Sequence, residues 1–199
     1  MKIIESNLKF KSKLSKRVKT NLIVLHHAVA SHCTIQDIHR WHLNRGWSGC
    51  GYHFLVRKDG SIYRGRPENV IGAHCLHHNN YSIGICAEGS YMQEVMPQIQ
   101  KKAIIELCKY LMYKYNIKDI KGHRELYNTS CPGDNFPFNE IVQAALKPKY
   151  NANFCLLFQK WYNTLTKHKL AEDGIYGPKT EKAYESIKNI LEDFSFRGF

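Results

Sequence analysis

Between residues 21 and 146, short apolar runs alternate with longer segments of helical spacing. Residues 21–26 are apolar and β-branched, which is typical of a buried strand. Asp59-Gly60 lies between two further runs and is a strong hairpin signal. Helix signals stand at Thr34, which an acid follows three residues later, and at Pro97. Strands that alternate with helices favour an α/β fold, in which helices flank a central mixed β-sheet.

The predicted elements of this unit are strands over residues 21–26, 51–57, 61–64, 81–87 and 117–121, and helices over 34–46, 97–116 and 137–146. Residues 147–153 have the composition of a linker, and the residues after them show helical spacing around a turn with glycine and proline at 172–180. About 45 residues bury little surface on their own. We therefore predict a domain over 1–148, with its core at about 20–146, and a small all-helical module over 149–199.

The chain is strongly basic, with 29 Lys and Arg against 17 Asp and Glu and a formal net charge of +12. The densest basic segment runs from Lys9 to Lys19. Such a charge suits an anionic partner, which could be a nucleic acid, a membrane surface or an anionic cell-wall polymer. A solvated face that aids solubility is the alternative interpretation.

The N-terminus lacks the apolar stretch and the small-residue cleavage site of a secretory signal, so we expect synthesis in a reducing cytoplasm without a signal peptide. The longest apolar runs, such as residues 22–25, are far too short to span a membrane. The seven cysteines are odd in number and include no CxxC pair. We therefore expect buried thiols rather than a disulfide framework.

The strongest chemical signal is a set of two histidines and one cysteine. His26 ends the first predicted strand, and His123 stands eight residues before Cys131 in a loop. Two imidazoles and a thiolate make a three-ligand zinc set, and three protein ligands leave a fourth position open for water, as in catalytic sites. The remaining histidines mostly fit a hydrogen-bonded structural role, and these are His32, His39, His42, His77, His78 and His168.

Four short motifs occur in a fixed order: Leu25-His26, Gly51-Tyr-His-Phe54, Ser82-Ile-Gly-Ile85, and Gly122-His-Arg with Thr129-Ser-Cys-Pro132. With these motifs the chain resembles the zinc-dependent N-acetylmuramoyl-L-alanine amidases over about residues 20–146. That family includes phage lysozymes of the amidase type and animal peptidoglycan recognition proteins. Any one motif alone is weak, whereas the ordered set is specific.

The resemblance implies that His26, His123 and Cys131 bind one Zn²⁺ ion. His27 is adjacent to the first ligand and would point to the opposite face of a strand, so His26 is the preferred residue. The same alternation separates Tyr52 from its neighbour, and only one of that pair can face a given site.

The resemblance also implies catalytic roles. Tyr52 corresponds to the catalytic tyrosine and would donate a hydrogen bond to the developing oxyanion. Thr129 stands where recognition proteins have threonine and phage enzymes have lysine, and it would orient water or the oxyanion. A related cytosolic group has a glutamate base at the position of Cys86. Here Glu88, two residues later, is a candidate base beside Tyr52 and water alone.

For the substrate, His74 matches a substrate-contacting histidine of the family, and Trp47, Arg66 and Asn80 are predicted to line the groove. The tail around residues 173–181 resembles the peptidoglycan-binding domain type 1, a three-helix module. Its alternative interpretation is a helical extension that packs on the catalytic domain.

These features favour an endolysin, an enzyme that hydrolyses the amide between N-acetylmuramic acid and L-alanine in peptidoglycan and so lyses the cell wall. Without a signal it would reach the wall after release, through a holin or lysis. Anionic wall polymers could bind its basic segment. A non-catalytic recognition protein and a cytosolic recycling amidase are the competitors. No nucleic-acid-binding motif occurs, so no nucleic acid partner is expected.

Overall fold

The computed structural model describes residues 1–147 and 152–195. The chain divides into two compact units, Met1–Ala145 and Leu146–Phe199. Residues 148–151 of the predicted linker lie outside the described residues. Across the described parts of the chain, the helices are too short or too polar to cross a membrane.

Six strands of the first unit form one sheet in the order β1 (Ile3–Glu5), β4 (Ile62–Arg64), β3 (Phe54–Val56), β5 (Ser82–Ala87), β2 (Leu22–His27) and β6 (Asp119–Gly122). The β3–β4 pair is the predicted hairpin and is antiparallel, whereas the other four neighbouring pairs are parallel. The predicted α/β fold with a mixed sheet is therefore confirmed.

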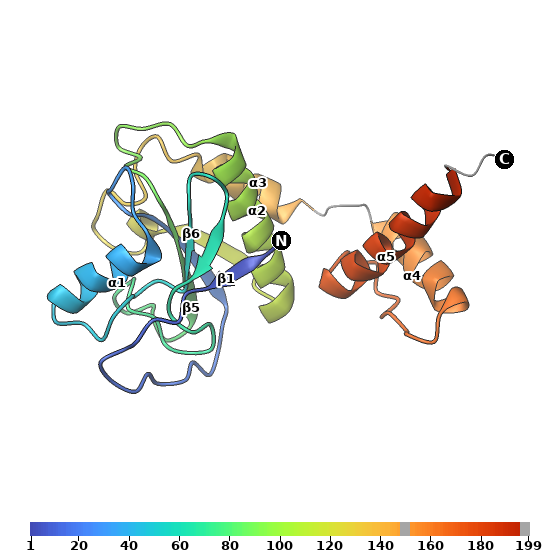
Figure 1. Cartoon of the computed structure of the whole chain (residues 1–199), viewed down its shortest axis with the longest axis horizontal. Helices are drawn as coiled ribbons and strands as arrows, with labels where there is room; N and C mark the ends of the chain where they lie inside the picture. Colours follow the sequence, from blue (N-terminus) through green and yellow to red (C-terminus); the bar gives the residue numbers. More distant parts are fainter. Residues whose placement is uncertain (148–151, 196–199) are drawn as a thin grey trace. The chain divides into compact units, whose positions relative to one another are not determined.

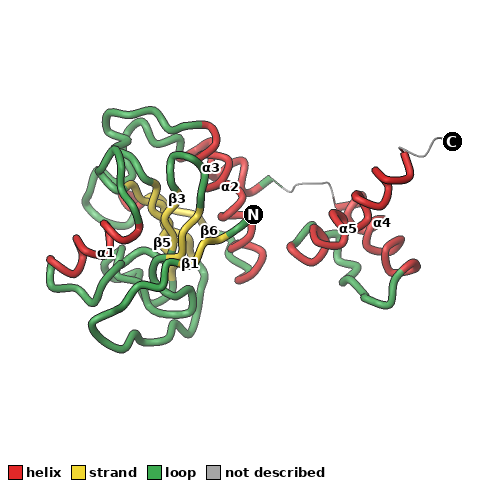
Figure 2. Tube along the Cα trace, viewed as in Figure 1, coloured by secondary structure: helices red, strands yellow, loops and turns green. Residues whose placement is uncertain are grey.

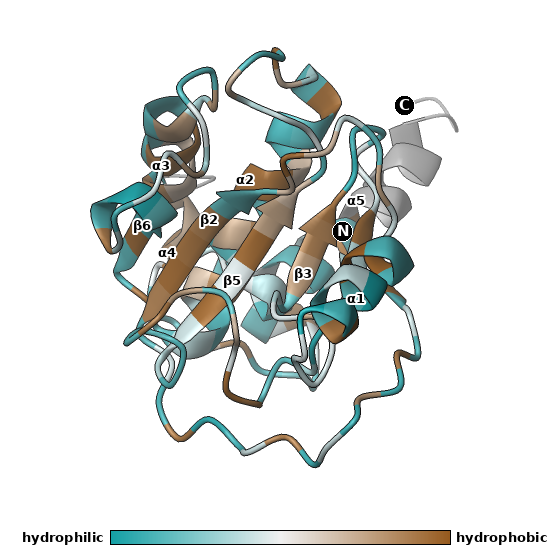
Figure 3. Cartoon of the chain, turned by 90° about the vertical axis from the view of Figure 1, so that its left-hand side faces the viewer, coloured by the Kyte–Doolittle hydropathy of each residue, from teal (hydrophilic) through white to brown (hydrophobic). Residues whose placement is uncertain are grey.

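Helices cover both faces of this sheet (Figures 1 and 2). Helix α1 (Ile35–Asn44) lies on one side, and α2 (Gln98–Tyr115) and α3 (Phe138–Leu146) lie on the other. The larger core fills the α2 side, where Ile23 and Leu25 of β2 pack with Leu107. A smaller core on the α1 side contains Ile38 and Leu55. Figure 3 shows the apolar residues of β2 and β5 between these layers. Burial on both faces explains why these strands read as apolar runs.

The first predicted helix begins as its sequence indicates. The Thr34 hydroxyl accepts a hydrogen bond from the Asp37 N–H, and the Asp37 carboxylate accepts one from the Thr34 N–H. This reciprocal capping box satisfies two backbone donors that the first turn leaves without partners. It fixes where α1 starts, and therefore which α1 side chains reach the end of the sheet.

Two strand predictions need correction. Strand β1 was absent from the sequence interpretation, because a three-residue edge strand has little signal of its own and its partner β4 is far away in the chain. The predicted strand over 51–57 is shorter, since only residues 54–56 are regular. The Gly51 N–H bonds Nδ1 of the His42 ring instead of a strand partner. Tyr52 therefore lies in the loop that precedes β3.

In the second unit, α4 (Ala152–Leu165) and α5 (Pro178–Ser195) are joined by an ordered loop. The buried side chain of Gln159 organises that loop: its amide N–H donates to Asp173 Oδ1 at 2.8 Å, and its oxygen accepts from the Gly174 N–H at 2.9 Å. Gly174 has φ +69°, a conformation that favours glycine. The helical prediction for this segment holds in the described residues.

Candidate active site and metal centre

The register of two parallel strands brings the predicted metal ligands together. Leu25 of β2 pairs with Gly122 of β6, so the next residues, His26 and His123, emerge side by side at the carboxyl ends of neighbouring strands. Their ring centroids are 4.5 Å apart. The Cys131 sulfur lies 3.7 Å from His26 Nδ1. One ligand atom from each of the three residues lies within 4.8 Å of the others. We refer to His26, His123 and Cys131 as the metal group.

The loop that carries Cys131 is held back against the start of the same segment. The Arg124 N–H donates to the Cys131 carbonyl at 2.8 Å, and the Arg124 guanidinium donates to Asp134 at 2.7 Å. The Glu125 carboxylate accepts from the Gly122 N–H at 2.6 Å. These bonds hold the loop closed over His123.

The three donors suit a metal ion. Two imidazole nitrogens and one sulfur are a donor set that zinc takes in catalytic sites, where three protein ligands leave one position open. Burial, and next the neighbouring His123, lower the pKa of His26 well below its usual value, and burial also lowers the pKa of His123. Both rings are therefore neutral at pH 7, which is the form that binds a metal. Burial raises the pKa of Cys131 to about 11, so it releases a proton when it ligates a cation.

A cavity of about 180 Å³ opens beside these donors and is lined in part by Tyr52, His123 and Cys131. The Tyr52 ring centroid lies 5.0 Å from that of His26. Burial, followed by the nearby thiols, raises the pKa of Tyr52 well above its usual value. Its hydroxyl therefore stays protonated and can donate a hydrogen bond into the cavity.

Close backbone packing explains the glycine before this tyrosine. A Cβ at Gly51 would lie 2.0 Å from the Ala73 carbonyl oxygen, far inside van der Waals contact. The Tyr52 carbonyl accepts a hydrogen bond from the Arg66 N–H at 2.8 Å. The loop before β3 is thus pressed against the 71–74 segment, and this contact fixes the position of Tyr52.

The cavity also contains residues that the sequence interpretation did not assign to the site, among them Trp41, His42 and Arg45. His42 was assigned to the structural histidines. Its Nδ1 accepts from the Gly51 N–H at 2.9 Å, which leaves Nε2–H as a donor. The signal lay in the helix, because residues 38, 41, 42 and 45 share one face of α1.

Thr129 lies next to the metal group. Its hydroxyl oxygen accepts a hydrogen bond from the Cys131 N–H at 3.2 Å, and its side chain is half-buried. The structure therefore places it where it shapes the ligand loop, and its predicted role toward water or the oxyanion stays a prediction.

Glu88 does not reach the metal group. Its carboxylate accepts hydrogen bonds from the backbone N–H groups of Cys33 and Lys58, at 2.9 and 2.8 Å, and pairs with Arg57 at 3.1 Å. Burial favours a raised pKa, but these donors outweigh it and hold the pKa of Glu88 below its usual value. A carboxylate engaged in this way is a poor proton acceptor, so the geometry gives no support to Glu88 as the general base.

His27, next to His26, and Cys86, two residues before Glu88, lie outside the metal group. The His27 ring accepts from the Tyr91 N–H at 3.0 Å, on the α2 face of the sheet, while His26 faces the α1 side. Cys86 pairs in register with His26 and is buried. Burial raises the pKa of this thiol well above its usual value. Neither residue adds an acid or a ligand at the site.

Of the predicted substrate residues, His74 is buried behind the metal group, with its Nδ1 3.1 Å from His26 Nε2. Trp47 is partly exposed beside the cavity, and its ring centroid lies 4.6 Å from that of His42. The Trp47 ring is therefore accessible next to His42 of the cavity wall, whereas the His74 ring contacts protein, and the substrate role of both residues stays a prediction.

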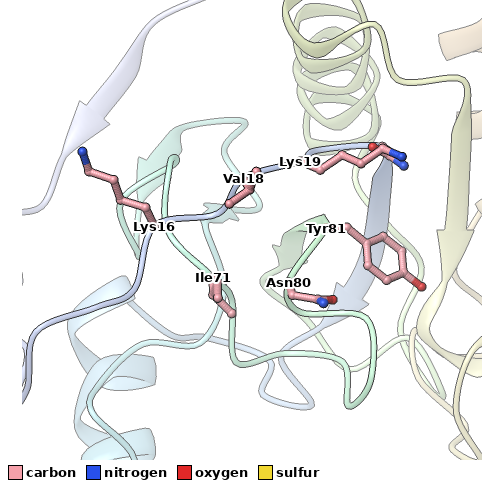
Figure 4. Close-up of a pocket in the computed structure, with 7 residues that line it drawn as sticks. Lys16, Val18, Lys19, Ile71, Asn80 and Tyr81 are labelled. Carbon is pink, nitrogen blue, oxygen red and sulfur yellow. The ribbon is translucent and has the colours of Figure 1, made fainter.

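Arg66 and Asn80 do not line this cavity. The Arg66 guanidinium is buried and donates to the carbonyls of Cys50 and Ile71, at 2.9 and 3.1 Å, so it braces the loop behind Tyr52. Asn80 lines a separate surface pocket with Lys16 and Tyr81 (Figure 4). The structure therefore separates the four predicted groove residues into different environments.

Comparison with known proteins places this site in context. The family model described as N-acetylmuramoyl-L-alanine amidase matches residues 16–134. Peptidoglycan-recognition protein SC2 of Drosophila melanogaster is 34% identical over 142 residues, covering 65% of this chain and 77% of the fly protein. The endolysin of Klebsiella phage KP32 is 29% identical over 131 residues, covering 61% and 86% of the two chains.

Solved structures agree with the fold. The N-acetylmuramoyl-L-alanine amidase LysC from Clostridium intestinale URNW is 47% identical and superposes with a TM-score of 0.71, covering 74% of this chain and 99% of that one. Drosophila PGRP-LB is 29% identical with a TM-score of 0.62, covering 71% and 92%.

Proposed function

The chain belongs to the N-acetylmuramoyl-L-alanine amidase family, and from that premise we propose that it is a zinc-dependent endolysin. Hydrolysis of the amide between N-acetylmuramic acid and L-alanine in peptidoglycan follows from the family and the similar endolysins. The observation that carries the zinc proposal is the convergence of His26, His123 and Cys131, whose ligand atoms lie within 4.8 Å of one another.

The residues present fit such an ion, because neutral imidazoles and a cysteine sulfur beside an open cavity are the expected ligands. Zinc bound there would polarise the scissile carbonyl and make water a nucleophile near neutral pH. Binding a muropeptide without cleaving it requires no such set. The intact donors therefore favour catalysis over a recognition role.

The protein groups around the cavity supply orientation and hydrogen bonds. Tyr52, protonated at neutral pH, would donate to the oxygen that becomes negative as the amide is attacked. His42 presents its Nε2–H, and Arg45 brings a positive charge to the same cavity wall. With Glu88 committed elsewhere, Tyr52 and water are the remaining candidates for moving a proton to the leaving amine.

The test is digestion of purified cell walls with the wild-type enzyme, with and without a chelator, and with His26→Ala. We expect new L-alanine amino groups without new reducing sugar ends, and no release after chelation or in the variant. His77→Asn is the matched control, because His77 is exposed with φ +66° and asparagine tolerates that conformation. New reducing ends alone would contradict amidase activity, and full activity after chelation would contradict the zinc requirement.

Two wall contacts outside the cavity belong to the same proposal. The 173–181 segment of the second unit, which runs from the loop into α5, supports a peptidoglycan-binding role, since its sequence resembles such modules. The exposed lysines of the basic segment Lys9–Lys19 would attract anionic wall polymers, whereas Arg17 of that segment is buried. Exposed charges are screened within about 8 Å at physiological salt. Binding to walls should therefore weaken steeply with added salt, and salt-insensitive binding would remove the idea.

We further propose that the enzyme is made in the cytoplasm and meets the wall after release, by a holin or by lysis. Fractionation of an expressing host, with and without a co-expressed holin, tests this order. Lysis by the enzyme alone from inside intact cells would contradict it.

A further inference from the structure

A buried line of hydrogen bonds leads away from the metal group through His74. His26 Nε2 lies 3.1 Å from His74 Nδ1, and His74 Nε2 lies 3.4 Å from the Ser82 hydroxyl. That hydroxyl donates to the His78 carbonyl at 2.7 Å. His26, His74 and Ser82 are all buried.

The last member fixes the direction of every bond in this line. The His78 carbonyl can only accept, so the Ser82 hydroxyl donates its proton to that carbonyl. The hydroxyl oxygen can then accept a hydrogen bond from His74 Nε2–H. His74 then has an unprotonated Nδ1, which accepts from His26 Nε2–H. His26 is left with its Nδ1 lone pair free, on the side where the Cys131 sulfur lies 3.7 Å away.

The His74 ring has little room to turn or withdraw. A Cβ at Gly84 would lie 2.6 Å from the ring, and one at Gly72 would lie 2.5 Å from it, so both glycine backbones pack directly on it. The backbone N–H of His74 donates to Asn79 Oδ1 at 2.7 Å, and that of Cys75 donates to the same atom at 3.0 Å. The ring is therefore a fixed acceptor rather than a mobile side chain facing substrate.

We propose that His74, itself set by Ser82, is a positioning residue that holds His26 as the Nε2–H tautomer with Nδ1 directed at the metal site. The inference rests on the proposed zinc function and assigns a role to two residues behind its ligands. Metal-binding histidines depend on the partner of their second nitrogen for tautomer and orientation. A neutral imidazole in that position orients His26 without adding negative charge, so a bound cation keeps its charge for the substrate.

A matched pair of substitutions isolates the acceptor. His74→Asn can present an amide oxygen near the position of Nδ1. The leucine of His74→Leu has nearly the size and shape of that asparagine but no hydrogen-bond acceptor. Zinc affinity, measured by competition with a chelator, should fall about 10- to 100-fold in His74→Leu, the usual cost of losing such a partner. His74→Asn should recover most of that loss, although both variants leave similar space where the ring was.

A second readout needs no metal. In the metal-free wild-type protein, ¹⁵N NMR of the imidazoles should show His26 as the Nε2–H tautomer, and Ser82→Ala should give a mixture of tautomers. Equal zinc affinity in His74→Asn and His74→Leu, or an Nδ1–H tautomer of His26 in the wild type, would overturn the inference. If His74→Leu fails to fold, the wild-type and Ser82→Ala spectra still decide it. Failure of the wild type to bind zinc would instead refute the proposed function.

Discussion

Two buried polar clusters lie at the carboxyl ends of the neighbouring strands β2 and β5, and they are built on opposite plans. Around His26, the donor atoms of His123 and Cys131 converge on a common point beside a cavity. Around Glu88, two backbone N–H groups and Arg57 surround the carboxylate. His26 and Glu88, the central residues of the two clusters, are each 1% exposed. The comparison shows that a buried titratable side chain can serve as a binding site when its neighbours leave its donor or acceptor atoms available. When the neighbours hydrogen-bond those atoms, the side chain stabilises the structure instead.

Cys131→Ser should have the largest effect, because it removes a ligand from the first cluster. A serine hydroxyl is not an anion at neutral pH, so zinc affinity should fall by at least about a hundredfold, more than the loss of a supporting partner costs, and amide hydrolysis should fall to near background. Zinc competition and release of L-alanine amino groups measure the two effects. Metal-free stability should change little, and a large loss of it would make Cys131 a structural residue instead.

Tyr52→Phe should lower turnover by about 10²- to 10³-fold, the usual cost of losing one oxyanion donor. Zinc affinity should stay near the wild-type value, because Tyr52 contacts the His26 ring without being one of the three ligands. The measurement is kcat on soluble muropeptide with zinc content determined in the same sample. Full turnover with zinc bound would show that the tyrosine hydroxyl has no catalytic role.

Glu88→Gln should act on stability instead of chemistry. The Glu88 carboxylate accepts from two backbone N–H groups and pairs with Arg57, whose side chain is 30% exposed, so losing this charged acceptor should cost about 1–3 kcal/mol. Denaturant unfolding measures this loss, while kcat of the folded variant should stay within about tenfold of the wild type, an order below the loss of an oxyanion donor. A thousandfold fall in kcat with unchanged stability would restore Glu88 as the base.

The stability difference between the wild type and Glu88→Gln should depend on pH. Because hydrogen bonds and Arg57 hold the pKa of Glu88 below its unfolded value, its stabilisation is complete above that unfolded value, about 4.3. It disappears as the pH falls through the folded pKa, since the wild type then protonates the same carboxyl. The difference in unfolding free energy between wild type and Glu88→Gln should shrink toward acid. A difference that grows toward acid would contradict a lowered pKa.

Thr129→Val should have the smallest effect. It removes one hydrogen bond to the Cys131 N–H, worth about 1 kcal/mol, and should weaken zinc binding by about fivefold. Thr129→Ser keeps the hydroxyl and is the control. If valine instead lowers kcat a hundredfold at saturating zinc, Thr129 acts on water or the oxyanion and not only on the ligand loop.

The sequence predicted the ligand types and the strand that carries them because these depend on local signals. Residues 21–26 alternate between two buried faces, and the position of His26 in that alternation follows from the period of two in a strand. The loop around Cys131 was likewise indicated by the sequence Ser130-Cys-Pro-Gly133. Strand β1 and the cavity role of His42 were not, since each depends on contacts with distant segments.

Taken alone, the sequence determined the mixed α/β sheet and singled out His26, His123 and Cys131, which the structure brings together, because periodicity, turn chemistry and ordered motifs depend on neighbouring residues. Only the tertiary structure decided that hydrogen-bond donors surround the Glu88 carboxylate and that the buried His74 ring contacts His26. Those outcomes depend on partners 55 residues away for Glu88 and 48 residues away for His74. The role of a side chain at the end of a strand depends on which of its atoms have no hydrogen-bond partner. Only the packing of the folded chain determines those partners.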